Sequence, residues 1–403
     1  MQILGGLGCI GKTTLIHQGI AELLGAGVPR EAILYCNYAT PSFAFTTPER
    51  FVNSALARTG FNRDSDLYLF FDEAQYLESW QEKLQELVRA FPKARVMAAV
   101  SCGAKNQHLP PLNFSEYLRF RGLQQSLFGE TEISEEQSSG GGMTVSPSDI
   151  PVLNDAFVEY VNSGGFPGNL VADRVLRRDL SGYFGIGDPQ GLENLFAVLA
   201  RNTAMEVSIE ELSGVVGVAK NTLRKYLDFL EQAFLIRRLP RLDRDGKPFQ
   251  RAVAFKVYLT APSLYAALFG PVAKDDKMFP RLAETALVAQ WAGSATEGRL
   301  AYASWRGGAI DLMEINPDTG LPVHVYELDW RDEYATPGSK ADRGPQELTD
   351  FVARTNRQAK AHILTATTAR LGAMAGIDIT LAPLALYAYW MGRNATGPDG
   401  SLS

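Results

Sequence analysis

Short apolar runs alternate with amphipathic patterns along the N-terminal part of the chain. Apolar runs that are typical of buried strands cover residues 1–4, 32–35, 67–72 and 95–101. Between them, apolar positions spaced three or four residues apart predict helices over 13–24 and 80–90. This alternation is typical of a parallel sheet with helices on both faces. We therefore predict an α/β domain over residues 1–128.

The pattern changes after this domain. Residues 129–149 include a Ser-Ser-Gly-Gly-Gly run and several acids, a composition that buries no core and predicts a flexible linker. Helical patterns return over 152–162 and 192–236, a β-rich stretch follows near 249–259, and from about 280 helix and strand patterns alternate again. We predict a small helical lid over 150–188, a second α/β unit over 275–391 and a disordered tail over 392–403.

Composition narrows the class of protein. Of the 403 residues, 46% are hydrophobic and 21% are charged, which is usual for a globular protein. The net charge of −6 means that any contact with nucleic acid must come from a local basic patch. No apolar stretch reaches the roughly 18–20 residues of a membrane span, and no secretory signal is evident. Cys9, Cys36 and Cys102 fit no disulfide framework or metal motif, so we expect a soluble cytoplasmic protein.

The run from Gly6 to Thr13 fits the phosphate-binding pattern G-x-x-x-x-G-K-[ST], the Walker A motif. Its glycines let backbone N–H groups curl around phosphate oxygens, and the helix that follows directs its positive dipole end at the same anion. Lys12 is expected to reach the β- and γ-phosphates of ATP, and Thr13 to bind Mg²⁺. The predicted nucleotide-binding residues are Gly6, Gly8, Cys9, Ile10, Gly11, Lys12, Thr13 and Thr14.

A second motif agrees with the first. The apolar run 67–71 ends in Asp72 and Glu73, a Walker B pattern in which Asp72 is expected to bind Mg²⁺ and Glu73 to polarise the attacking water. A third apolar run ends at Ser101, where a polar side chain can sense the γ-phosphate. Such a pair of acids favours water as the nucleophile, and so predicts ATP hydrolysis. The predicted catalytic residues are Glu73, Lys12 and Ser101.

These motifs resemble those of the predicted AAA+ ATPases of bacteria and archaea that carry a C-terminal domain of unknown function. The matching stretches are residues 6–15, 71–77 with Trp80, 112–118, 164–167, the helical pair around 208–234, and 256–258. The resemblance implies a P-loop fold of the AAA+/ASCE type, a winged helix over 189–262 and a restriction-endonuclease-like core. It also implies an oligomer with an arginine acting in trans, but residues 103–108, where the family carries that segment, contain no arginine.

The predicted winged helix includes a capping box, Ser208 to Glu211, and a second helix over 221–234 in the recognition position. Its apolar residues share one face, and a basic segment follows it, with seven basic against two acidic residues between Ile236 and Lys256. Two interpretations remain open: contact with DNA phosphates, or packing against the rest of the protein. The candidate DNA contacts are Lys220, Arg224, Lys225, Arg237, Arg238, Arg241 and Arg244.

Three acids are spaced like those of PD-(D/E)XK nucleases. Glu284 lies on a predicted helix, and Asp311 and Glu327 lie on successive strands, an arrangement that can gather Mg²⁺ at a scissile phosphate. The usual lysine position holds Asp329 instead, so we interpret this core as a degenerate nuclease fold.

The resulting hypothesis is an ATPase with ATP and Mg²⁺ as cofactors, whose cycle moves the attached domains in a DNA-related process. Two alternatives remain: a nucleotide-switched scaffold with negligible turnover, and an ATP-regulated nuclease.

Overall fold

The computed structural model describes residues 1–43, 45–101, 108–128, 150–166, 188–249, 254–292, 299–334 and 343–396. These residues form two compact units, one built mainly from Met1–Pro110 and the other mainly from the chain after Pro110. The predicted linker over 129–149, and the part of the predicted lid over 167–187, lie outside the described residues.

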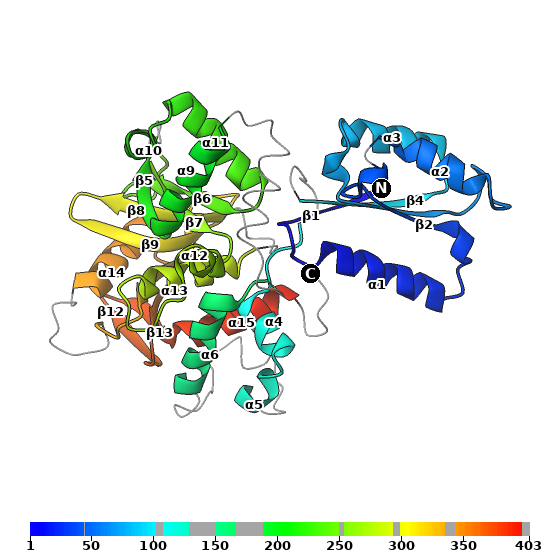
Figure 1. The fold of residues 1–403 in the computed structure, drawn as a ribbon. Coiled ribbons are helices and arrows are strands. Elements are labelled where there is room, and N and C mark those ends of the chain that lie inside the picture. Colours follow the sequence, from blue (N-terminus) through cyan, green and yellow to red (C-terminus); the bar gives the residue numbers. More distant parts are fainter. Residues whose placement is uncertain are drawn as a thin grey trace. The chain divides into compact units, whose positions relative to one another are not determined.

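The first unit is a parallel sheet with helices on both faces. Its strand order is β1-β4-β3-β2, formed by Gln2–Gly5, Arg95–Val100, Tyr68–Asp72 and Ile33–Asn37, and every pairing is parallel. Helix α1 (Lys12–Gly25) covers one face, and α2 (Pro48–Leu56) and α3 (Trp80–Ala90) cover the other (Figure 1). The predicted strands and helices are all present within two residues of their expected ends, whereas α2 was not predicted.

The strand order places the carboxyl ends of β1, β3 and β4 side by side. Strand β4 lies between β1, which leads into the glycine loop, and β3, which ends in the acid pair. Ligands of parallel α/β sheets bind outside the carboxyl ends of the strands. The predicted P-loop fold with a parallel sheet is therefore present in residues 1–110.

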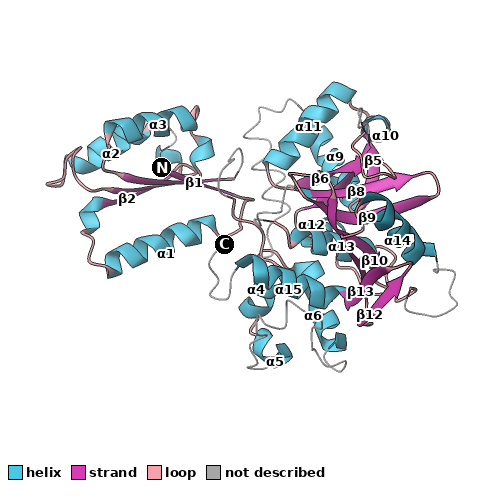
Figure 2. Ribbon diagram, turned by 180° about the vertical axis from the view of Figure 1, so that it is seen from behind, coloured by secondary structure: helices cyan, strands magenta, loops and turns pink. Residues whose placement is uncertain are grey.

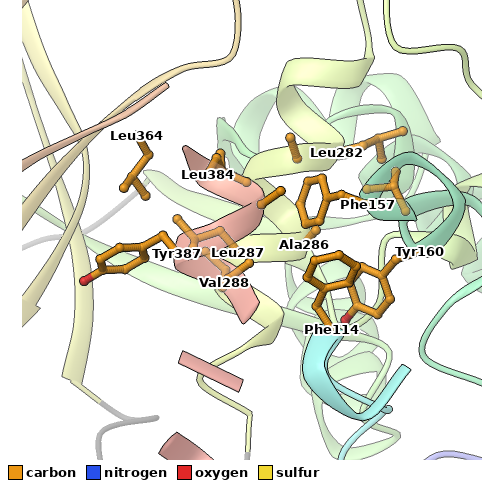
Figure 3. Close-up of a cluster of buried hydrophobic side chains, with 14 of the residues drawn as sticks. Phe114, Phe157, Tyr160, Leu282, Ala286, Leu287, Val288, Leu364, Leu384 and Tyr387 are labelled. Atoms are coloured by element: carbon orange, nitrogen blue, oxygen red, sulfur yellow. The ribbon is translucent and has the colours of Figure 1, made fainter. Parts of the chain in front are cut away.

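The second unit has a large helical core (Figure 3). Phe114, Phe157 and Tyr160 pack with their ring centroids 5.1–6.2 Å apart. Leu287 and Leu384 belong to the same buried cluster. The helices that contribute are α4 (Phe114–Phe120), α6 (Ile150–Ser163), α13 (Phe279–Ala289) and α15 (Leu384–Thr396).

The residues that form this core do not follow the domain boundaries predicted from the sequence. Residues 114–128, which form α4 and α5 (Gln124–Phe128), belong to the second unit and not to the phosphate-binding domain. Two long-range bonds hold α4 there: Asn113 Nδ2 donates to the Gly392 carbonyl at 3.2 Å, and the Phe114 N–H donates to Gln290 Oε1 at 2.9 Å. Helix α6, predicted as part of a lid, is buried in the same core. Helix α15 also continues to Thr396, so the start of the predicted disordered tail is helical.

A nine-stranded sheet runs through the described part of this unit, in the order β12-β13-β11-β10-β9-β8-β6-β7-β5 (Figure 2). Alternate residues face opposite sides. On β10, for example, Tyr326 joins the α13–α15 core, and Val325 joins a second cluster beneath α14 (Arg343–Thr355). The strands are β5 (Met205–Ser208), β6 (Ile236–Leu242), β7 (Ala254–Leu259), β8 (Leu300–Trp305), β9 (Gly308–Ile315), β10 (Pro322–Asp329), β11 (Lys360–Thr365), β12 (Arg370–Met374) and β13 (Ile377–Pro383).

One end of this sheet is built from the segment predicted as a winged helix. The elements run α9 (Pro189–Arg201), β5, α10 (Ile209–Val216), α11 (Lys220–Gln232), β6 and β7, and β7 lies between β5 and β6. The predicted capping box is present: Ser208 and Glu211 exchange hydrogen bonds at the start of α10. Strand β6 also pairs with β8 in parallel, at Arg241–Tyr302 and Leu242–Ala303, so this basic strand is part of a continuous sheet and is not a free wing.

Another helix, α12 (Ser263–Phe269), follows β7 and packs on α6. Within the described ranges, every helix is too short or too polar to cross a lipid bilayer.

Candidate functional site

The glycine loop has a backbone that only certain residues can adopt. Gly6 and Gly11 have φ angles of 150° and 107°, and Cys9 lies in the left-handed region at 64°. A Cβ atom at Gly6 would come within 2.6 Å of the Leu109 carbonyl oxygen. This close approach and the positive φ both explain why glycine is needed there. Among the other predicted loop residues, Gly8 and Ile10 are buried, whereas Cys9 and Thr14 are exposed.

The Lys12 ammonium lies inside this loop. Its Nζ donates hydrogen bonds to the Gly6 carbonyl at 2.8 Å, the Leu7 carbonyl at 2.9 Å and Ser101 Oγ at 3.0 Å. The residue is only 4% exposed. Because these three acceptors are neutral, a phosphate oxygen would be a stronger partner for the ammonium than any of them.

Asp72 is fully buried at the end of β3, beside Thr13. Its Oδ2 accepts hydrogen bonds from Thr13 Oγ1 at 2.8 Å, Tyr35 OH at 3.0 Å and Asn37 Nδ2 at 3.3 Å. Burial, opposed in part by Asn37, raises the pKa of the Tyr35 phenol to about 12, so it remains a donor. A hydroxyl and a carboxylate held this close are the hard oxygen ligands that suit Mg²⁺. Tyr35 and Asn37 were not assigned a role: Tyr35 lies on the strand predicted over 32–35, and Asn37 lies two residues beyond that prediction, at the end of β2.

Glu73 lies next to Ser101, which in turn accepts a hydrogen bond from Lys12. Its backbone lies in the left-handed region, with φ of 51°. Glu73 Oε2 accepts a hydrogen bond from Ser101 Oγ at 3.2 Å and another from Gln75 Nε2. The chain Lys12–Ser101–Glu73–Gln75 therefore links the loop to the acid pair. Gln75 was not assigned a role, and the only signal for it was its place two residues after the acid.

A second polar cluster lies in the other unit. Lys256 Nζ is 2.7 Å from Glu284 Oε1 and 3.7 Å from Asp311 Oδ1, and it donates to the Asp311 carbonyl at 2.9 Å. Tyr258 OH donates to the same Glu284 oxygen at 2.6 Å. The sequence placed Lys256 on an exposed basic wing, but it is 7% exposed and neutralises these acids. Strand β7, which carries Lys256, therefore brings a lysine against two of the predicted acids.

Glu327 lies beside this cluster and forms no ion pair within 4 Å among the described residues. Its Oε1 is buried and has no hydrogen-bond partner among the described residues. Burial, and next the nearby Asp311, raise the pKa of the Glu327 carboxyl well above its usual range. The predicted acids thus converge, although no group of three or more His, Cys, Asp or Glu side chains in the described ranges is arranged to hold a metal.

Asp329, at the expected lysine position, serves the turn that follows β10. Its two carboxylate oxygens accept the Glu333 N–H at 2.8 Å and the Tyr334 N–H at 2.7 Å. The Asp329 carboxylate therefore faces the backbone of this turn.

The candidate DNA contacts divide into two groups. Lys220, Arg224 and Lys225 are exposed on α11, on the side opposite its buried apolar residues. Lys220 pairs with Glu210 at 2.8 Å.

The arginines of β6 and the turn after it form the second group. Arg241 is held by the Ser304 carbonyl and Glu206. Arg238 lies over the Phe255 ring, Arg237 is half-buried, and Arg244 is exposed. Of the seven candidate contacts, the exposed ones are therefore Lys220, Arg224 and Lys225 on α11, together with Arg244 after β6.

The parallel sheet, the glycine loop and the acid pair define residues 1–110 as a P-loop NTPase domain. These residues match a family described as an AAA domain. Residues 169–275 match a family described as a domain of unknown function (DUF8612). The expected AAA-like family is thus supported for the first domain.

A relative from Haemophilus influenzae, described as an uncharacterized protein, is 24% identical over 273 residues. The alignment covers 63% of this chain and 66% of that relative, so the chain spans just under two thirds of the relative's length.

Remote likeness to solved structures is also found. A Walker-type ATPase of Pyrococcus abyssi aligns with a TM-score of 0.38 and 14% identity, over 66% of this chain and 90% of that one. A mutant RuvB of Thermotoga maritima aligns with a TM-score of 0.25 and 17% identity, over 59% of this chain and 82% of that one. Cdc6p from Pyrobaculum aerophilum aligns with a TM-score of 0.22 and 12% identity, over 71% of this chain and 87% of that one.

Proposed function

We propose that the first domain binds ATP with Mg²⁺ and hydrolyses it to ADP and phosphate. The observation that supports this most directly is the convergence of Lys12, Ser101 and Glu73 at adjacent strand ends, with Thr13 and Asp72 paired beside them. A cation for phosphate, two oxygen ligands for Mg²⁺ and a carboxylate for water are the parts that phosphoryl transfer to water needs.

Each side chain has a separate role in this proposal. Lys12 exchanges its carbonyl partners for β- and γ-phosphate oxygens, and Thr13 and Asp72 hold Mg²⁺, which neutralises phosphate charge. Glu73 orients the attacking water and takes its proton. Ser101 lies between Lys12 and Glu73 and contacts the γ-phosphate. The P-loop residues Gly6, Gly8, Cys9, Ile10, Gly11 and Thr14 surround the phosphates with backbone N–H groups.

Replacing Lys12 with alanine is expected to weaken ATP binding about 10- to 100-fold, since a charge-assisted hydrogen bond contributes roughly 1.5–3 kcal/mol. Binding of a fluorescent ATP analogue with Mg²⁺ measures this, with phosphate release by the wild type recorded alongside. Lys93→Ala, an exposed lysine of the same unit, is the control. Equal affinity of the Lys12 variant and the wild type would contradict the proposed site.

We further propose that the ATP cycle drives conformational change in a DNA-binding winged helix over 189–262. The order of its elements, the sheet order β5-β7-β6 and the exposed basic side chains of α11 support this. Helix α11 would then be the recognition helix. The half-buried and paired arginines of β6 favour a contact surface centred on α11 over one that includes the wing.

The double substitution Arg224→Ala and Lys225→Ala is expected to weaken binding of duplex DNA and to reduce the salt slope by about one or two, because up to two phosphate contacts are lost. Fluorescence anisotropy over a range of salt concentrations measures both quantities. Lys277→Ala with Arg306→Ala removes two exposed charges elsewhere in the same unit and is the matched control. Equal loss in both double variants would indicate a general charge effect and contradict a dedicated surface.

For the region 275–391 we propose a degenerate nuclease fold used for binding or assembly. A helix with Glu284, the meander β8-β9-β10 and a crossover through α14 to β11 support the nuclease-like arrangement. Burial of Glu284 and Glu327, and the ion pair of Lys256 with Glu284, argue against access by a phosphodiester. A cytoplasmic location, inferred from the cysteine pattern and the lack of an evident signal or span, and a homo-oligomer, implied by the family resemblance, remain proposals. So do the alternatives of a nucleotide-switched scaffold and an ATP-regulated nuclease.

A further inference from the structure

Gln75 connects the two strand ends that carry Glu73 and Ser101. It lies half-buried in a short 3₁₀ helix, Ala74–Tyr76, directly after the acid pair. Its Nε2 donates to Glu73 Oε2, and its Oε1 accepts the Ser101 N–H at 3.1 Å. One amide side chain therefore fixes both the carboxylate at the end of β3 and the backbone at the end of β4.

Both hydrogen bonds to the Glu73 carboxylate end on the same oxygen. Gln75 Nε2 and Ser101 Oγ each donate to Oε2. Within the described part of the chain, this leaves Oε1 as the oxygen that can accept a proton from water. The donors thus determine which carboxylate oxygen is available and in which direction its lone pairs point.

Such a restraint matters because the carboxylate has little rotational preference of its own. The terminal torsion of a glutamate side chain is broad, so neighbouring donors must set its orientation. A general base works only when a lone pair points at the proton that it removes. The Ser101 hydroxyl also accepts a hydrogen bond from Lys12, which must move toward phosphate when ATP binds. Ser101 donates to Glu73 through the same hydroxyl that Lys12 contacts, whereas Gln75 donates through its own side-chain amide.

We propose that Gln75 is a positioning residue for ATP hydrolysis: it holds Glu73 Oε2 so that Oε1 faces the attacking water throughout the nucleotide cycle. This inference rests on the proposed hydrolysis of ATP. Gln75 does not touch the nucleotide in this mechanism, so its removal lowers the rate of the chemical step and leaves ATP affinity unchanged.

Two substitutions separate positioning from simple bracing of β4. Gln75→Leu removes both hydrogen bonds without adding a charge, whereas Gln75→Glu keeps an acceptor for the Ser101 N–H, loses the donor to Glu73 and adds a negative charge beside it. Steady-state phosphate release with Mg²⁺-ATP gives kcat and KM for each, binding of a fluorescent ATP analogue gives affinity, and thermal unfolding reports folding. Gln81→Leu, an exposed glutamine on α3, is the matched control.

Both Gln75 variants are expected to lose about 10- to 100-fold in kcat, the effect of one hydrogen bond to a charged group, with KM within about twofold of wild type. If Gln75→Glu keeps the wild-type kcat while Gln75→Leu loses it, Gln75 only braces β4 and the inference is wrong. An unchanged kcat in both variants, or a change in KM alone, also overturns it. If Gln75→Leu fails to fold, Gln75→Glu decides. An absence of turnover in the wild type would instead overturn the proposed hydrolysis, and this inference with it.

Discussion

Replacing Lys256 with methionine is expected to destabilise the second unit by about 3–5 kcal/mol, because it leaves buried acids without their counter-charge. The Lys256 ammonium is 2.7 Å from Glu284, and both side chains are about one-tenth exposed. Burial by itself lowers the pKa of Lys256, but the adjacent Glu284 and Asp311 outweigh it and the pKa is raised, so the lysine is charged at neutral pH. Methionine keeps much of the side-chain length and removes the charge, which isolates the electrostatic part of the effect.

Denaturant unfolding followed by tryptophan fluorescence measures this loss. It reports mainly on the second unit, which contains four of the five tryptophans, Trp291, Trp305, Trp330 and Trp390. Lys247→Met, at an exposed position, is the control. Adding Glu284→Gln to Lys256→Met is expected to restore part of the stability, since the uncompensated charge is gone and Tyr258 still has an acceptor. A loss no larger than that of the Lys247 variant would show that the cluster is not a buried ion pair in solution.

Replacing Glu73 with glutamine is expected to lower ATP turnover about 10²- to 10⁴-fold, the usual contribution of a positioned general base. Glutamine keeps the shape of the side chain and can still accept from Ser101 and Gln75. Lys12, Thr13 and Asp72 are untouched, so ATP binding should change little. The variant is therefore expected to hold ATP without turning it over.

Phosphate release and binding of a fluorescent ATP analogue test this, each with and without duplex DNA. Glu86→Gln, an exposed glutamate on α3, is the control. A wild-type rate that rises with DNA and disappears in Glu73→Gln would support a DNA-coupled ATPase. Bound ATP with no turnover in either protein would contradict hydrolysis and favour the nucleotide-switched scaffold.

Features whose residues lie close together in the chain were predicted from the sequence. The glycine loop and the acid pair each occupy a few consecutive residues, and the strands that carry them were predicted within two residues of their ends. The capping box at Ser208 and the buried face of α11 were also predicted, because both depend on neighbours within one or two helical turns. Gln75 escaped this approach because its second partner, Ser101, is 26 residues away.

Contacts between residues far apart in the sequence explain where the structure differs from the sequence-based predictions. Asn113 bonds to Gly392 across 279 positions, and this attaches α4 to the second unit. In the sequence, Lys256 is one more residue of a basic segment. In the structure, β7 lies beside helix α13, and Lys256 therefore meets Glu284.

The sequence by itself determined the phosphate-binding motif and the parallel α/β class of the first domain. Only the tertiary structure decided which unit α4 joins, that β6 continues into a nine-stranded sheet among the described strands, and that Lys256 neutralises Glu284. The physical reason is that the sequence shows which charged side chains a segment carries. Whether those side chains are buried and paired depends on which distant segment packs against them.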